Sequence, residues 1–210
     1  MKSLARALAA TLLALLAPTL LGARTPYDRP ENDPTMTDAK KSLVVYFSRA
    51  GENYGVGTVE KGNTRLVAER IARETGADLF EILPREAYPE RYDACIEAAR
   101  REKEAGARPE LAADIDIGGY DTIFVGYPNW WGDLPMGVYA FLESHDWSGK
   151  RIAPFCTHEG SGLSDTPGRI AATCAGATVT EGLALRGTTA QRDGEQTRRA
   201  VVRWLGKIGR

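Results

Sequence analysis

The sequence predicts an α/β fold in which a parallel sheet lies between two layers of helices. Short apolar runs of strand length alternate along the chain with segments whose apolar residues recur every three to four positions. This alternation is typical of βαβ units. The strand-length runs are so apolar that we expect them to be buried on both faces, which requires helices on each side.

Five strands and five helices account for this pattern. The strands are expected at residues 43–47, 78–83, 122–127, 151–156 and 178–185. Helical spacing is shown by Leu66, Val67 and Ile71; by Tyr92, Cys95, Ile96 and Ala99; by Val138, Phe141 and Leu142; by Ile170 and Cys174; and by Val201, Trp204, Leu205 and Ile208. We expect the charged run at residues 100–104 to be the solvent-exposed end of the second helix.

Residues 1–23 have the layout of a secretory signal peptide. Lys2 and Arg6 precede an almost wholly apolar stretch, which ends at the small residues Gly22 and Ala23. That stretch is short for a membrane span. We therefore expect a periplasmic or secreted protein with no stable membrane span once the leader is removed.

Residues 24–40 are rich in Pro, Asp, Asn and Thr, a composition that predicts a disordered linker. The folded domain would then occupy residues 41–210. Met36 offers a competing start of translation just ahead of the first strand. A chain that began there would lack the leader and would be cytoplasmic.

The composition limits the classes of function. The 210 residues are 43% hydrophobic and 26% charged, as in an ordinary globular domain with a substantial core. The net charge of −1 gives no basic footprint for a nucleic acid. Three widely spaced cysteines form neither a disulfide framework nor a metal motif, and two histidines exclude a histidine-rich metal site.

A candidate phosphate site follows the first strand. Residues 43–72 are predicted to form a strand, a glycine-rich loop and a helix, and anions bind at such helix N-termini. Residues 57–64 match the nucleotide-binding pattern G-x-x-x-x-G-K-[ST] except that Asn63 replaces the lysine. That lysine reaches the outer phosphates, so the case for ATP or GTP is weakened. A degenerate P-loop nucleotide-binding protein remains an alternative.

The polar groups of this segment suit one compact phosphate. Ser48 and Thr64 supply hydroxyls, Asn63 supplies an amide near the helix start, and Gly51 and Gly62 give a flexible backbone. The other interpretation is a capped helix that follows a glycine-rich turn and binds nothing.

A second loop, at residues 128–135, places Trp130 beside Trp131 between Pro128 and Gly132. Adjacent indoles in a loop would offer a stacking surface to a planar aromatic ligand. The alternative is that one indole packs beneath the loop and the other is partly exposed. Because the loop follows a strand, we expect it to open on the same edge of the sheet as the phosphate segment.

A third loop, at residues 157–164, also follows a strand, and its glycines would let backbone amides approach a ligand. Ser161 lacks the G-x-S-x-G context of a hydrolase nucleophile. His158 has the pKa range of a proton donor to a reduced acceptor. The alternative for His158 is a loop histidine that is held by backbone hydrogen bonds.

These three segments resemble the signatures of the flavodoxin family. The signatures are YFSxxG with GNT, GYPxWWGxxPM and FCTHxGSG, found here at residues 46–51 with 62–64, 126–136 and 155–162. The resemblance implies a three-layer sandwich whose five parallel strands lie in the order 2-1-3-4-5. It also implies non-covalently bound FMN as the cofactor.

The resemblance assigns roles by position. The FMN phosphate would contact Ser48, Arg49, Gly51, Gly62, Asn63 and Thr64. The flavin ring would lie between Pro128, Asn129, Trp130, Trp131 and Gly132 on one loop and Thr157, His158, Glu159, Gly160 and Gly162 on another. Which tryptophan stacks on the ring is left open, and neither a catalytic residue nor a metal is implied.

The implied function is electron transfer through the flavin to a redox partner protein or to a small acceptor such as a quinone. The alternative within the same fold is an NAD(P)H-dependent FMN quinone reductase. One feature departs from the family pattern, because residues 52–61 divide the phosphate loop. This insert either bulges outward, so that the two halves still converge, or folds over the ligand, so that Tyr54 covers the flavin.

Overall fold

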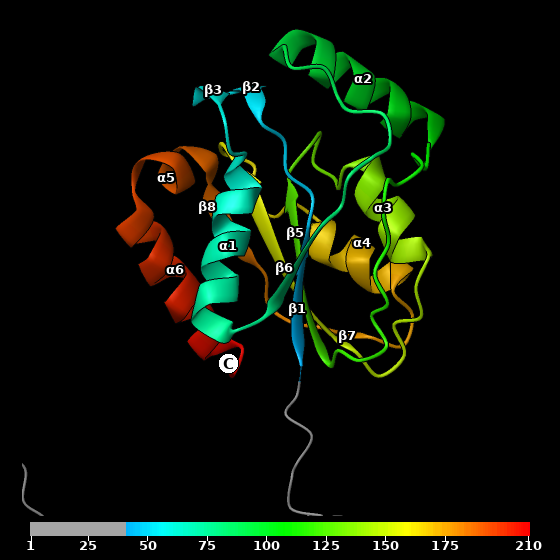
Figure 1. The fold of residues 1–210 in the computed structure, drawn as a ribbon, viewed down its shortest axis with the longest axis vertical. Helices are drawn as coiled ribbons and strands as arrows, with labels where there is room; N and C mark the ends of the chain where they lie inside the picture. Colours follow the sequence, from blue (N-terminus) through cyan, green and yellow to red (C-terminus); the bar gives the residue numbers. More distant parts are fainter. Residues whose placement is uncertain (1–40) are drawn as a thin grey trace, which may run out of the picture. The chain divides into compact units, whose positions relative to one another are not determined.

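A parallel sheet runs through the middle of the computed structural model, which describes residues 41–210 (Figure 1). Its strand order is β4-β1-β5-β6-β7, and β8 also pairs with β6. The strands are β1 (Ser42–Tyr46), β4 (Asp78–Glu81), β5 (Thr122–Pro128), β6 (Arg151–His158), β7 (Thr178–Val179) and β8 (Leu183–Arg186). Because β7 and β8 together form the fifth strand position, the expected order 2-1-3-4-5 is confirmed.

Both faces of the sheet are covered. Helices α1 (Asn63–Thr75), α5 (Gly187–Arg192) and α6 (Gly194–Lys207) lie on one face, and α3 (Met136–Glu143) and α4 (Thr166–Thr173) lie on the other (Figure 1). Alternating side chains of β1 enter the two cores, since Val44 packs with Val67 on one side and Val45 with Phe141 on the other. The residues of both cores are buried, and the strands that they hold in place carry the loops at their ends.

Helix α2 (Tyr92–Ala105) was expected to cover a sheet face, but it lies beyond the carboxyl ends of the strands (Figure 1). Only Cys95 and Ala99 of this helix are buried, so its apolar side is small. The following segment takes its place against the sheet, with Ile117 in the core beside α3. The expectation of a helix at this place in the sequence is confirmed, and its expected position is wrong.

The insert forms a β-hairpin. Strands β2 (Gly51–Asn53) and β3 (Gly57–Val59) pair antiparallel, and the turn between them carries Gly55 at φ 77°. Residues 57–64 are thus divided between β3 and the start of α1 and do not form one continuous phosphate loop.

The leader expected at residues 1–23 and the linker expected at 24–40 lie outside the described residues. Within residues 41–210, no helix has both the length and the apolar character needed to cross a membrane.

Candidate functional site

The two halves of the predicted phosphate loop converge despite the hairpin between them. The backbone N–H of Arg65, in the first turn of α1, donates to the Ser48 Oγ at 3.0 Å. The hydroxyl oxygens of Thr64 and Thr157 lie 2.7 Å apart, and both side chains are buried. The contact joins the start of α1 to the end of β6, so the first and third predicted loops meet at one edge of the sheet.

The N-terminus of α1 has the character of an anion site. Its N-cap residue, Gly62, makes no side-chain hydrogen bond, and the first turn contains no acidic residue. In α6, by contrast, the N-cap Asp193 accepts a hydrogen bond from the backbone of Gln196. The first-turn amides of a helix have no intrahelical acceptor, and the helix dipole makes this end positive. The start of α1 therefore offers donors to a bound anion.

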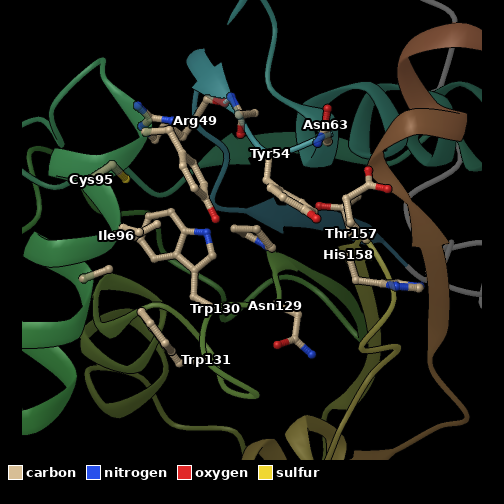
Figure 2. A pocket seen from close by; sticks show the side chains of 15 residues that line it. Arg49, Tyr54, Asn63, Cys95, Ile96, Asn129, Trp130, Trp131, Thr157 and His158 are labelled. Carbon is tan, nitrogen blue, oxygen red and sulfur yellow. Dashed lines mark hydrogen bonds between the residues drawn. The ribbon is translucent and has the colours of Figure 1, made fainter. Parts of the chain in front are cut away.

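Beside this helix start lies a cavity of about 260 Å³ (Figure 2). Many of the predicted site residues line it, namely Arg49, Asn63, Pro128, Asn129, Trp130, Trp131, Thr157, His158 and Glu159. The other predicted residues belong to the same three loops but do not line the cavity: Ser48, Gly51, Gly62, Thr64, Gly132, Gly160 and Gly162.

Sequence reasoning missed one wall of the cavity. Tyr92, Cys95, Ile96 and Ala99 of α2 line it, together with Asn53 and Tyr54 of the hairpin. The helical spacing of the α2 residues was visible in the sequence, but it was assigned to the core. Tyr54 was considered a cover for the ligand, and Figure 2 shows its ring pointing into the cavity.

The two tryptophans differ in their surroundings. The Trp130 indole packs edge to face against Phe47 at 5.3 Å and Tyr88 at 5.1 Å between ring centroids. Trp131 is 55% exposed and has a positive φ of 58°. The arrangement matches the alternative in which one indole packs beneath the loop and the other is partly exposed. Both nevertheless line the cavity.

A tight turn presents Trp131. The backbone groups of Trp130 and Asp133 exchange two hydrogen bonds of 3.0 Å, and Gly132 has φ 73°. Two central residues with positive φ define the type I′ turn, which favours Asn-Gly and not a bulky residue at the first position. The Asn129 side chain accepts from the Gly132 N–H at 3.0 Å and donates to the Gly162 carbonyl at 2.9 Å, which joins the second and third loops.

Arg49 joins the hairpin to the segment that leads into α2. Its guanidinium donates to the carbonyl oxygens of Glu52 at 2.5 Å, Pro89 at 2.6 Å and Glu90 at 2.5 Å. The Tyr92 N–H donates to the Glu52 carboxylate at 2.9 Å. Arg49 therefore lies at the cavity, but protein carbonyl groups accept the hydrogen bonds that were expected to reach a phosphate.

The polar groups beside the Thr157 end of the cavity are largely satisfied. The Glu159 carboxylate accepts from the backbone N–H and the hydroxyl of Thr188 at 2.6 and 3.1 Å. The His158 Nδ1 accepts from the Gly160 N–H at 2.9 Å, and its ring points away from the cavity centre (Figure 2). Burial, with a smaller effect of Arg186, lowers the pKa of His158. These contacts fit the interpretation of His158 as a loop histidine held by the backbone.

The cysteines of the described part of the chain are buried, and its other potential metal ligands are dispersed. Cys95, Cys156 and Cys174 are free and buried, and burial raises the pKa of Cys156 and of Cys174 to about 12. Among residues 41–210, no group of three or more His, Cys, Asp or Glu side chains is placed to hold a metal ion.

Comparison with known proteins gives one family and several similar structures. Residues 41–207 match the family model described as flavodoxin. No curated protein sequence matches the chain. A protein from Bacteroides eggerthii, assigned as a flavoprotein, is 27% identical over 81% of this chain and 98% of its own, with a TM-score of 0.65.

Two further structures have the same fold. A protein from Bacteroides uniformis, also assigned as a flavoprotein, is 26% identical over 78% of this chain and 98% of its own, with a TM-score of 0.63. A Lactobacillus acidophilus flavoprotein, solved in complex with FMN, is 23% identical over 73% of this chain and 98% of its own, with a TM-score of 0.55.

Proposed function

This chain belongs to the flavodoxin family, and from that premise we propose that it binds FMN non-covalently in the 260 Å³ cavity and serves as a redox protein. The observation that carries the proposal is the meeting of three separate loops beside the N-terminus of α1, whose N-cap residue is a glycine. A mononucleotide with one phosphate needs this combination of anion donors and a neighbouring aromatic cleft.

The residues present fit the phosphate of FMN. The hydroxyl of Ser48, whose oxygen already accepts from the Arg65 N–H, and the first-turn amides of α1 ahead of Arg65 would hold it. Gly62 keeps this cradle open, since a Cβ on Gly62 would come within 3.0 Å of the Ser48 Oγ. Thr64 joins the start of α1 to β6 through its contact with Thr157 and so holds this cradle against the sheet.

The residues also fit a flat aromatic ring. We assign the stacking contact to Trp131, because its indole is largely exposed at the cavity and its backbone has a positive φ, a strain that is concentrated at ligand sites. Trp130, which Phe47 and Tyr88 hold on two sides, would form a fixed floor. Tyr54 and Tyr92, whose ring centroids lie 6.1 Å apart, would exclude water from above.

FMN supplies redox chemistry, with transfer of one or two electrons, and the protein adjusts it through nearby charge and hydrogen bonds. The Glu159 carboxylate lines the cavity, so its negative charge disfavours the addition of electrons nearby. Asp133 does not line the cavity, and both Lys103 and Arg169 lie 3.3 Å from its carboxylate. Its effect on a ligand is therefore small.

Calorimetric titration of the full-length protein with FMN, riboflavin and ATP tests the proposal. FMN should bind most tightly, riboflavin more weakly because it lacks the phosphate, and ATP not measurably. Preferential binding of ATP would favour the degenerate P-loop instead. Steady oxidation of NADPH with a quinone would favour a reductase. A loaded protein that has no such turnover but exchanges single electrons with a redox partner would favour an electron carrier.

A further inference from the structure

Helix α2 is a wall of the cavity that polar contacts hold in place. Its residues Cys95, Ile96 and Ala99 line the cavity, yet only Cys95 and Ala99 of the helix are buried. At its N-terminal end, Arg49 and Glu52 attach the helix entry to the hairpin. Toward its other end, Glu102 accepts a hydrogen bond from the Tyr88 hydroxyl, and a second polar contact attaches this end to the turn that carries Trp131.

Lys103 provides that attachment. Its Nζ donates to the Trp131 carbonyl oxygen at 2.8 Å and lies 3.3 Å from the Asp133 Oδ2. The side chain is 35% exposed, whereas that of Asp133 is 5% exposed. The charged run at residues 100–104 was expected to be a solvent-exposed helix end. Arg100 agrees with that expectation, since it pairs with Glu97 and Glu104 on its own helix. The Lys103 side chain instead extends away from α2 to the turn that carries Trp131.

The contact falls on the strained part of the turn. Trp131 is a bulky residue with positive φ, a conformation that persists only where its surroundings impose it. The peptide that joins Trp131 to Gly132 is held from both sides, because its carbonyl accepts from Lys103 and its N–H donates to Asn129. Lys103 thus contributes one of the two hydrogen bonds that fix this peptide.

Two cations lie close to one carboxylate of the turn. Lys103 and Arg169 both lie 3.3 Å from the Asp133 carboxylate, and the charge of Asp165 also acts on Arg169. Asp133 also accepts from the Tyr139 hydroxyl and the Leu134 N–H at 2.8 Å. The Lys103 charge lies beside the turn that presents Trp131 to the cavity.

We propose that Lys103 is a positioning residue for the flavin: it fixes the Trp131–Gly132 peptide and the α2 wall, and it places positive charge beside the ring. This inference rests on the proposed FMN function. It makes the end of α2 part of the redox site, although Lys103 does not line the cavity itself.

The test compares full-length wild type with Lys103→Met and Lys103→Arg. Lys207→Met is the matched control, because Lys207 lies at the end of α6 and its Nζ pairs with the Glu181 carboxylate at 3.3 Å. Lys103→Met should raise the Kd for FMN about tenfold, as expected for loss of a charge-assisted hydrogen bond. It should also make the midpoint potential more negative, because positive charge favours added electrons. Lys103→Arg should restore both quantities, and Lys207→Met should change neither.

An unchanged Kd and potential in Lys103→Met would overturn the inference, and so would a failure of Lys103→Arg to restore them. Hydrogen exchange of the α2 amides without FMN gives an independent readout, which should be faster in Lys103→Met. Should that variant fail to fold, Lys103→Gln, which keeps a donor without the charge, should still lower the potential. A wild type that does not bind FMN would contradict the proposed function itself. If only the inference about Lys103 is wrong, the wild type still binds FMN.

Discussion

Gly62 lies directly against Ser48, so that no side chain fits between them. A Cβ added to Gly62 would come within 3.0 Å of both the Ser48 Oγ and the Arg49 carbonyl oxygen. The two residues stand on opposite sides of the hairpin insert, and their contact closes the phosphate cradle. The site therefore depends on a backbone approach that only glycine permits at position 62.

Gly62→Ala should separate the two halves of the cradle. We expect a loss of about 1–3 kcal/mol in the free energy of unfolding, as for other overpacked sites, and a larger loss of FMN affinity. Gly206→Ala is the control, because a Cβ there meets nothing within 4 Å, and it should be neutral or stabilising by up to about 1 kcal/mol. Denaturant unfolding and FMN titration measure the two effects. Wild-type affinity in Gly62→Ala would contradict the assigned cradle.

Trp131→Asn should change the stability of the apoprotein and its affinity for FMN in opposite directions. Asn-Gly is the preferred pair of a type I′ turn, so relief of the strain at Trp131 should stabilise the apoprotein by up to about 1 kcal/mol. The same change removes the stacking surface and should weaken FMN binding. Thermal unfolding without ligand and flavin fluorescence titration check the two parts. Tighter or equal FMN binding would remove Trp131 from the site.

Trp130→Ala should lower the stability of the protein, whereas Trp131→Asn should raise it. The indole packs against Phe47 and Tyr88, so its removal should cost about 2–4 kcal/mol of unfolding free energy. Denaturant unfolding in parallel with Trp131→Asn provides the comparison. If Trp130→Ala unfolded like wild type but lost FMN, the assignment of the two tryptophans would have to be exchanged.

Arg49→Met distinguishes a phosphate contact from an anchor of the hairpin. Its donors bind the carbonyls of Glu52, Pro89 and Glu90. We therefore expect Arg49→Met to weaken FMN and riboflavin by similar factors, because both need the hairpin in place. Parallel titrations with the two ligands supply the measurement. Loss of affinity for FMN alone would identify Arg49 as a direct phosphate ligand.

His158 should titrate below its usual pKa of 6.5, since burial disfavours the imidazolium. The folded state then binds the proton less readily than the unfolded state. The resulting stability is present above pH 6.5 and falls as the pH drops towards the folded pKa. NMR titration of wild type, with His158→Gln for assignment, should show the low midpoint, and the variant should lose this part of the pH dependence. A midpoint above 6.5 would show that a charged partner had been overlooked.

The sheet could be predicted because the strand-length runs are buried and therefore apolar throughout, whereas its strand order came from the resemblance to the flavodoxin family. Val44 and Val45 enter opposite cores, as a strand buried on both faces requires. That the first and third loops meet, as they do at Thr64 and Thr157, also followed from the sequence, because carboxyl ends of parallel strands share one edge. The second and third loops were placed by the same argument.

The wall formed by α2 could not be predicted in this way. Tyr92, Cys95, Ile96 and Ala99 repeat at helical spacing, but the spacing identifies an apolar face without saying what the face contacts. Lys103 was hidden for a related reason, since a lysine in a charged run is usually solvated. Its partners, Trp131 and Asp133, are distant in sequence, and only the tertiary structure brings them together.

The most direct test of the account is a visible absorption spectrum of the purified full-length protein, before and after incubation with FMN, with the released cofactor identified by mass. We expect the absorption of a bound flavin and release of FMN, at one flavin per cavity, on denaturation. A colourless protein that takes up no added FMN would contradict the central claim.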